Sequence, residues 1–447
     1  MNRLARRAWF TMVLAGALIL GMVIIGVRYF TDAPDWVMFR NSGGTVVDRS
    51  GTLVLDATDG RSYAESETVR KAMLHILGDS QGNIPAYLLD EYGDELVGFD
   101  LLNGTYHSGE RSGRMQLTLS ADVQHAALDA MGDYKGALGV YNYKTGEILC
   151  MISTPTFDPT SPPDVQGNPE RYDGVYVNRF LHATYTPGST FKLVTAAAAL
   201  EEIPDIRERT FYCEGEQEIA GETVVCNGVH GTVNFEQGLA QSCNVVFGEV
   251  AAELGADTLS RYAEQLGVTD SLSFDGFITR RGSFDLSRAS AYETAWAGIG
   301  QYTDQVNLCQ YMTFVGAIAN GGVAAKPYLV ENVVFGETEK YAVKPELLPR
   351  ALSAETADEL AEMMHYAVVN QYGEWYFSGL YAGAKSGTAE RGEDQAANAL
   401  LVGFTQDENC PLAFVMVLEG GDGGSSVCAP VISQVLNACV VAMQQSS

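Results

Sequence analysis

Two residues near the middle of the chain have the types and spacing of an activated serine. Ser189 follows Pro187-Gly188, and an alanine-rich segment typical of a helix begins at Phe191. On a helix, Ser189 and Lys192 share one face, so their side chains can touch. A helix N-terminus favours an oxyanion, and a desolvated lysine is neutral and can accept the hydroxyl proton. The alternative, a capped helix with a surface lysine, needs no chemistry, and this pattern alone does not exclude it.

Two further motifs favour the catalytic interpretation. Ser242-Cys243-Asn244 comes next along the chain, and Lys385-Ser386-Gly387-Thr388 comes last, after the apolar segment Leu380–Ala384, which predicts a strand. Ser-x-x-Lys, Ser-x-Asn and Lys-Ser/Thr-Gly in this order form the signature set of penicillin-binding proteins and class A β-lactamases. Three motifs in the right order and in fitting local contexts are a specific signal.

Residues from about 114 to 447 resemble the transpeptidase domain of a class B penicillin-binding protein. The stretch Asn142–Pro159 and the pair Asn178-Arg179 before the serine helix are also similar to that family. The resemblance implies an α/β fold of the serine β-lactamase type, with an antiparallel sheet flanked by helices and an all-helical subdomain. It also implies an N-terminal transmembrane helix and a small α+β pedestal.

The resemblance implies a role for each motif residue. Ser189 is the nucleophile and Lys192 the general base, and the backbone N–H groups of Ser189 and Thr388 form the oxyanion hole. Ser242, together with Lys385, relays a proton to the departing D-alanine. The substrate-binding residues are expected to be Asn244, Ser386, Gly387 and Thr388.

The implied function is that of a peptidoglycan D,D-transpeptidase. It cross-links stem peptides through a Ser189 acyl-enzyme, releases the terminal D-alanine and is acylated by β-lactams. A D,D-carboxypeptidase, which uses water as the acceptor, stays an alternative. A β-lactamase is disfavoured because no Glu-x-x-Leu-Asn stretch lies between Asn244 and Lys385. An inactive scaffold or a β-lactam sensor is disfavoured because every motif residue is present. A role in elongation, division or sporulation is left open.

The first residues of the chain predict a membrane anchor. Ala8–Val27 is an uncharged, mostly apolar run, whose length as a helix of about 30 Å matches a bilayer core. The preceding Arg3, Arg6 and Arg7 place the N-terminus in the cytoplasm. A cleaved signal peptide is the alternative, but the A-x-A pattern Ala15-Gly16-Ala17 lies inside the apolar run instead of after it. We expect a single-pass cell-membrane protein whose catalytic domain is extracytoplasmic.

The chain is expected to have three segments. These are a cytoplasmic tail with the transmembrane anchor (1–30), a short N-terminal pedestal (31–113) and the transpeptidase domain (114–447). Class B members lack a glycosyltransferase domain, so the resemblance implies a membrane-embedded glycosyltransferase partner of the SEDS family. The net charge of −28 argues against nucleic acid as a partner.

Other patterns are assigned no chemistry. Gly78–Gly82 matches Gly-x-Ser-x-Gly, but a helix precedes it and a loop follows it, which is the wrong context. A second Lys-Thr-Gly, at Lys144, lies in a turn between two strands expected over 137–143 and 147–153. A disulfide between Cys213 and Cys226 is one possibility outside the cytoplasm. No His/Cys/Asp cluster has metal-ligand spacing and His230 is assigned a structural role, so we expect neither a metal nor a cofactor.

Overall fold

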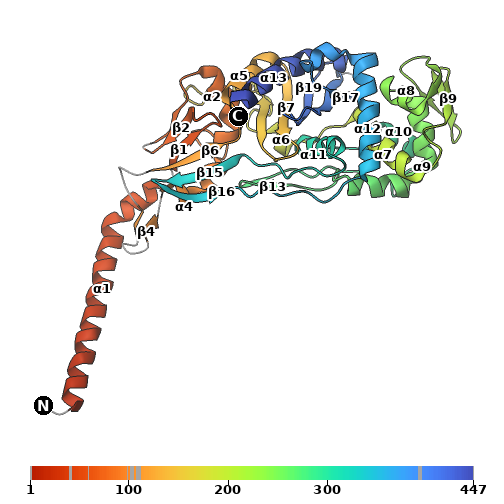
Figure 1. Ribbon diagram of the computed structural model, residues 1–447. Coiled ribbons are helices and arrows are strands. Elements are labelled where there is room, and N and C mark those ends of the chain that lie inside the picture. The colour runs from red at the N-terminus through yellow and green to blue at the C-terminus, as the bar shows by residue number, and fades with distance from the viewer. Residues whose placement is uncertain are drawn as a thin grey trace.

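The computed structural model describes residues 3–39, 43–58, 60–97, 99–100, 105–106, 112–390 and 395–445. A long N-terminal helix, α1 (Arg3–Phe39), extends away from an elongated body that contains the remaining elements (Figure 1). The body consists of a mixed sheet near α1, a central antiparallel sheet with helices on both faces, and a mainly helical region at the far end (Figure 1).

The central sheet has five antiparallel strands in the order β17-β18-β19-β7-β8. Residues that alternate along β18 and β19 contribute to two different hydrophobic clusters, one on each face of the sheet. Because both faces are covered, the strands read as continuous apolar runs, which made them easy to predict. Their bounds are Lys135–Asn142 (β7), Ile148–Thr154 (β8), Ala382–Ala389 (β17), Asn398–Thr405 (β18) and Leu412–Glu419 (β19).

Helices cover the two faces of this sheet. On one face lie α5 (Ala121–Met131) and the C-terminal helix α13 (Ser425–Gln445), and on the other lies α11 (Leu308–Ala319). Ser120 caps α5 by accepting a hydrogen bond from the backbone N–H of Val123. The arrangement is the predicted sheet flanked by helices.

The helical region lies beside β17 and contains the serine and Ser-x-Asn motifs. A four-stranded insertion projects from it in two hairpin-like pairs, β9–β12 and β10–β11 (Figure 1). Its helices are α7 (Lys192–Glu202), α8 (Phe235–Ala240), α9 (Asn244–Gln265), α10 (Ala291–Ile299) and α12 (Ala354–Ala367). The short helix α6 (Arg179–His182) instead packs against β7 and β8 of the central sheet. The insertion strands are β9 (Thr210–Cys213), β10 (Glu216–Ile219), β11 (Glu222–Val225) and β12 (Gly231–Asn234), and a small hairpin follows, β13 (Ser273–Phe274) with β14 (Phe277–Ile278).

The sheet near α1 combines strands from distant parts of the sequence. Its order is β16-β15-β6-β1-β2-β3, so strands after residue 329 pair with strands before residue 118. The strands are β1 (Gly43–Val47), β2 (Leu53–Ala57), β3 (Ser62–Tyr63), β6 (Gly113–Leu117), β15 (Val330–Phe335) and β16 (Thr338–Ala342). Nearby elements are α2 (Glu67–Leu77), α3 (Tyr87–Glu91), α4 (Gly93–Val97) and the pair β4 (Phe99–Asp100) and β5 (Thr105–Tyr106).

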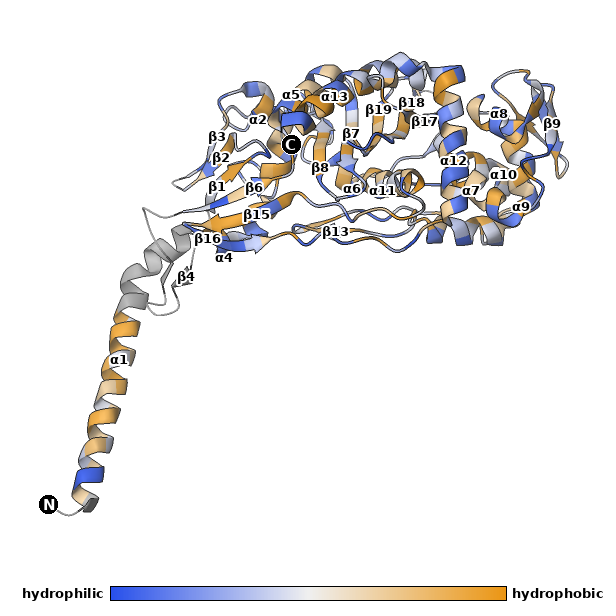
Figure 2. Ribbon diagram, viewed as in Figure 1, coloured by the Kyte–Doolittle hydropathy of each residue, from blue (hydrophilic) through white to orange (hydrophobic). Residues whose placement is uncertain are grey.

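Two long apolar helices differ in what surrounds them. Ala5–Val27 of α1 has a mean hydropathy of 2.5 and none of it is buried in the protein, so it is a candidate membrane span (Figure 2). The helix α13 is also long and apolar, but 44% of its most apolar window is buried and it packs on the central sheet. We therefore assign α13 to the core.

The structure changes the predicted extent of one strand. The apolar strand expected to end before Lys385 continues through it, so the whole Lys-Ser-Gly-Thr motif lies within β17. Helix α9 is kinked at Gly255, which adopts a φ of 77°, and it continues to Gln265. The pattern at Gly78–Gly82 follows α2 and leads into a loop, and Lys144 lies in the turn between β7 and β8, as expected.

Candidate active site

Ser189 is placed at the cavity by a tight turn before α7. Gly188–Phe191 forms a 3₁₀ turn that leads directly into α7. Gly188 has a φ of 53°, and its N–H donates a hydrogen bond of 3.0 Å to the carbonyl oxygen of Gly300. A Cβ atom on Gly188 would lie 2.7 Å from the carbonyl oxygen of Thr388. Glycine at this position therefore allows the serine turn to approach β17.

Lys192 connects the serine to the second motif. The side chain is fully buried, and its Nζ donates to Ser189 Oγ at 3.1 Å. The same Nζ lies 3.1 Å from Ser242 Oγ and 2.8 Å from Asn244 Oδ1. It also donates to the Ser242 carbonyl at 2.7 Å. The surface-lysine alternative is therefore wrong.

Burial, and then the neighbouring Lys385 cation, lower the pKa of Lys192 well below its usual value. Both effects penalise the protonated ammonium, since low polarity and a like charge each favour the neutral amine. A neutral lysine in contact with a serine hydroxyl is able to act as a general base.

The Ser-x-Asn motif lies in the break between α8 and α9. Ser242 has a φ of 58°, which turns the chain sharply before α9 begins at Asn244. Asn244 Nδ2 donates a hydrogen bond to the carbonyl oxygen of Val225, at the end of β11. Ser242 Oγ receives a hydrogen bond of 3.1 Å from Lys385 Nζ. Ser242 is thus in contact with both motif lysines.

The third motif lies on β17, the edge strand of the central sheet. Lys385 is fully buried, and burial lowers its pKa to about 7. Ser386 donates from both its backbone N–H, at 3.1 Å, and its Oγ, at 3.2 Å, to the hydroxyl of Tyr372. Gln301 Nε2 donates at 2.9 Å to the carbonyl oxygen of Thr388. Tyr372 and Gln301 belong to none of the three motifs, and for this reason neither was predicted.

Glycine is required at position 387 by the packing of β17 against the serine turn. A Cβ atom at this position would lie 2.9 Å from the carbonyl oxygen of Pro187 and 3.0 Å from Thr190 Cγ2. The close approach is therefore between β17 and the serine turn, in addition to any approach of a substrate.

The three motifs surround one cavity of about 710 Å³. Six of the eight predicted site residues line it, and Lys192 and Lys385 lie buried beneath them. Helix α10 contributes the aromatic side chains of Tyr292 and Trp296 to its lining. Its lining comprises Ser189, Val225, Cys226, Asn227, Ser242, Asn244, Tyr292, Glu293, Trp296, Ile299, Gln301, Tyr302, Ser386, Gly387, Thr388 and Glu390.

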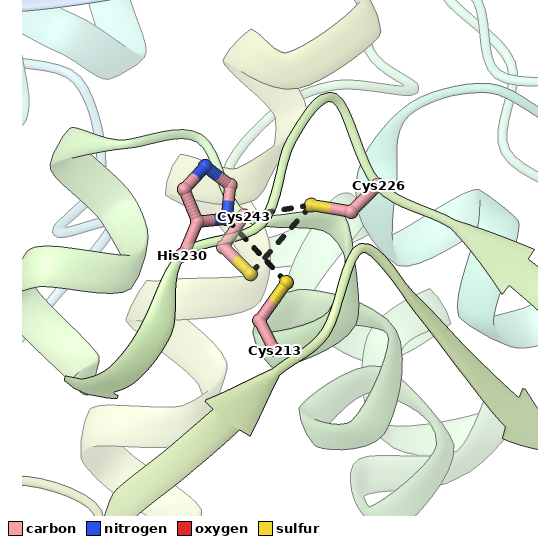
Figure 3. A group of neighbouring side chains, drawn as sticks. All are labelled: Cys213, Cys226, His230 and Cys243. Carbon is pink, nitrogen blue, oxygen red and sulfur yellow. Dashed lines mark hydrogen bonds between the residues drawn. The ribbon is translucent and has the colours of Figure 1, made fainter.

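A group of soft ligand atoms lies at the margin of this cavity. Cys213, Cys226, His230 and Cys243 bring three sulfurs and one imidazole nitrogen within 4.8 Å of one another (Figure 3). Their spacing in the sequence does not resemble that of a metal site, and strand pairing nevertheless brings the four residues together. The disulfide considered between Cys213 and Cys226 is not formed, since both are free thiols.

Residues 136–437 match the family model of the penicillin binding protein transpeptidase domain. The chain belongs to this family. The match contains all eight predicted site residues and confirms the predicted class B penicillin-binding protein resemblance. The fold brings these eight residues together at one cavity.

Curated relatives agree with the family. Stage V sporulation protein D of Bacillus subtilis (strain 168) is 28% identical over 408 residues, which cover 87% of this chain and 60% of that protein. The peptidoglycan D,D-transpeptidase PbpA of Mycolicibacterium smegmatis is 29% identical over 356 residues, or 72% of this chain and 71% of that protein. This chain therefore spans less than two thirds of the length of the Bacillus protein.

Solved structures confirm the fold. The D,D-transpeptidase domain of a peptidoglycan glycosyltransferase from Eggerthella lenta aligns with a TM-score of 0.76 and 28% identity, over 90% of this chain and 99% of that one. Penicillin-binding protein A from M. tuberculosis, solved as a ceftriaxone acyl-enzyme, aligns with a TM-score of 0.77 over 90% of this chain and 98% of that one. At 23% identity, the second likeness supports the fold alone.

Proposed function

We propose that this chain is a serine D,D-transpeptidase that cross-links peptidoglycan stem peptides. The observation that carries the proposal is the contact of 3.1 Å between Lys192 Nζ and Ser189 Oγ, made by a buried lysine whose pKa is lowered. Ser189 attacks the carbonyl between the two terminal D-alanines, and Lys192 accepts the hydroxyl proton. The Oγ–carbonyl bond forms and gives a tetrahedral oxyanion.

The backbone N–H groups of Ser189 and Thr388 are assigned to the oxyanion hole. Along an antiparallel edge strand, the N–H and C=O of every second residue point away from the neighbouring strand. Ser386 N–H bonds Tyr372, and the Thr388 carbonyl bonds Gln301, so both residues present their polar groups away from β18. The N–H of Thr388 is thereby directed to the side of β17 on which the serine turn lies, which supports the assignment.

Ser242 is assigned to the proton relay. Its Oγ lies 3.1 Å from the Nζ of both Lys192 and Lys385. When the peptide C–N bond breaks, the proton held by Lys192 passes through Ser242 to the departing D-alanine amine. An amine from a neighbouring stem then attacks the acyl-enzyme and gives its proton to Lys192. The Ser189 ester bond breaks as the cross-link forms, and Lys192 returns the proton to Ser189 Oγ.

The remaining motif residues are assigned to substrate binding. In its protonated form, Lys385 attracts the terminal carboxylate, and the hydroxyls of Ser386 and Thr388 donate hydrogen bonds to it. Asn244 binds the substrate amide. A D,D-carboxypeptidase would use the same groups, with water in place of the acceptor amine.

The membrane arrangement completes the proposal. Residues 1–30 form a cytoplasmic tail and single-pass anchor, 31–113 a pedestal, and 114–447 the extracytoplasmic transpeptidase domain. The exposed apolar surface of Ala5–Val27 supports the membrane span in this arrangement. A SEDS-family glycosyltransferase is proposed as the partner that supplies glycan strands to this domain.

The test follows the fate of a stem peptide ending in D-Ala-D-Ala, with and without an added amine acceptor. A transpeptidase releases D-alanine and forms a cross-linked product when the amine is present, and Ser189→Ala forms neither. Release of D-alanine with hydrolysed peptide as the sole product at saturating amine would contradict the proposal in favour of the carboxypeptidase.

A further inference from the structure

The four soft side chains beside the cavity come from separate elements that converge. Cys213 ends β9, Cys226 follows β11, His230 precedes β12, and Cys243 is the middle residue of the Ser-x-Asn motif. The register of β9 and β12 pairs Cys213 with Gly231, which places His230 beside Cys213. The three sulfurs and the Nδ1 atom face a common centre (Figure 3). We refer to these four residues as the Cys₃His group.

The distances within the Cys₃His group match those between the ligands of one tetrahedral zinc ion. His230 Nδ1 lies 3.5 Å from the sulfurs of both Cys213 and Cys226. The sulfurs of Cys226 and Cys243 are 3.7 Å apart. With Zn–S near 2.3 Å and Zn–N near 2.0 Å, a tetrahedron separates two sulfurs by about 3.8 Å and sulfur from nitrogen by about 3.5 Å. A disulfide requires about 2.05 Å between sulfurs.

We propose that the Cys₃His group binds one Zn²⁺ ion in a closed structural site. Thiolate and imidazole ligands select zinc over hard cations such as Mg²⁺ and Ca²⁺, which require oxygen ligands. Four protein ligands complete a tetrahedral shell and leave no position for a substrate, as in structural zinc sites. Cys213 and Cys243 are fully buried, which keeps water from the inner side of the site.

The ion holds the four-stranded insertion, β9 to β12, against the turn that carries Ser242 and Asn244. The backbone N–H of Asn244 donates to Cys226 Sγ at 3.2 Å, an N–H···S bond of the kind that orients metal-bound thiolates. Asn244 is also tied to the insertion through its bond to the Val225 carbonyl. Zinc binding does not depend on the proposed function, whereas any effect of the ion on acylation rests on it.

The experiment measures metal on the full chain, purified in detergent and dialysed against metal-free buffer. We expect about one zinc ion per chain by elemental analysis. Exchange with Co²⁺ should give thiolate-to-cobalt charge-transfer bands and intense tetrahedral d–d bands. Cys213→Ser and His230→Gln should lower the zinc content severalfold, and Cys410→Ser, a buried cysteine outside the Cys₃His group, should retain it.

Three results would overturn the proposal. The first is that the wild-type protein takes up no zinc from a Zn²⁺ solution. The second is that a disulfide joins two of the three cysteines in the freshly purified protein. The third is that the variants contain as much zinc as the wild type. If the variants fail to fold, the cobalt spectrum of the wild type decides, because its charge-transfer bands require Cys–Co bonds. If the wild-type protein binds zinc but is not labelled by penicillin, the result counts against the proposed function and not against the metal site.

Discussion

Ser242 Oγ lies 3.1 Å from Lys385 Nζ, and the same oxygen is equally far from Lys192 Nζ. Two buried lysines therefore share one serine hydroxyl. The like charges cannot both be present at low cost, because burial and mutual repulsion disfavour a second ammonium. Burial first, and then the charge of Lys385, lower the pKa of Lys192 well below its usual value, and burial lowers that of Lys385 to about 7.

Replacement of Lys192 by Met should slow acylation of Ser189 by about 10²–10⁴-fold, the usual contribution of a general base. The methionine fills a similar volume but cannot accept the proton. The measurement is the second-order rate constant for a fluorescent penicillin. The control is Lys144→Met, which removes the lysine of Lys144-Thr145-Gly146 in the turn between β7 and β8 and should leave the rate unchanged. Equal rates for Lys192→Met and wild type would contradict the base assignment.

The acylation rate should follow a bell-shaped pH profile for a β-lactam that carries a carboxylate. The rate rises with pH as Lys192 loses its proton, and it falls as Lys385, with a pKa of about 7, loses the charge that attracts the carboxylate. Lys385→Arg keeps its charge at higher pH and should move the alkaline limb upward. A flat profile across neutral pH would count against these two roles.

Tyr372→Phe should weaken the binding of a carboxylated substrate by about 2- to 10-fold, which corresponds to about 0.5–1.5 kcal/mol for a hydrogen bond. The hydroxyl accepts hydrogen bonds from both the N–H and Oγ of Ser386, and without it Ser386 is free to turn away. The change should appear mainly in KM. Tyr134→Phe, at an exposed position, is the control. A lower kcat with unchanged KM would contradict this positioning role.

Gly188→Ala should disrupt the contact between the serine turn and β17. The new Cβ would meet the Thr388 carbonyl at 2.7 Å, at a φ of 53°. We expect about 1–3 kcal/mol of lost stability and acylation slowed by about 10²-fold, the order expected when reacting groups move by about 1 Å.

Gly321→Ala is the matched control for this substitution. Gly321 has a similar φ of 59°, but no atom lies within 4 Å of its added Cβ. It should cost about 1 kcal/mol from backbone strain alone and leave acylation unchanged. The measurements are thermal unfolding and the rate of penicillin labelling. If the two variants lose acylation to a comparable extent, the close approach of the serine turn to β17 is unimportant.

The sequence predicted the central strands and the three motifs because these are local patterns. Strands buried on both faces, such as β18 and β19, are apolar runs, and Ser189 with Lys192 is recognisable within four residues. The pairing of β15 with β6 joins residues more than 200 positions apart, and no local pattern carries that information.

The missed site residues depend on the same long-range contacts. Tyr372 lies in a π-helical turn after α12 and reaches Ser386 only because α12 packs against β17. The Cys₃His group is assembled by the register of β9 with β12, so the spacing between its cysteines differs from that of short zinc motifs. A cysteine inside the Ser-x-Asn motif was the available hint.

The central claim is that Ser189 is the nucleophile, and intact-mass analysis of the full chain with benzylpenicillin tests it most directly. The account predicts one persistent adduct that maps to Ser189 after digestion. The adduct should be absent from Ser189→Ala and retained by Ser80→Ala, which changes the serine of the Gly78–Gly82 pattern. An adduct that persists on folded Ser189→Ala, or that maps to another residue of the wild type, would contradict it.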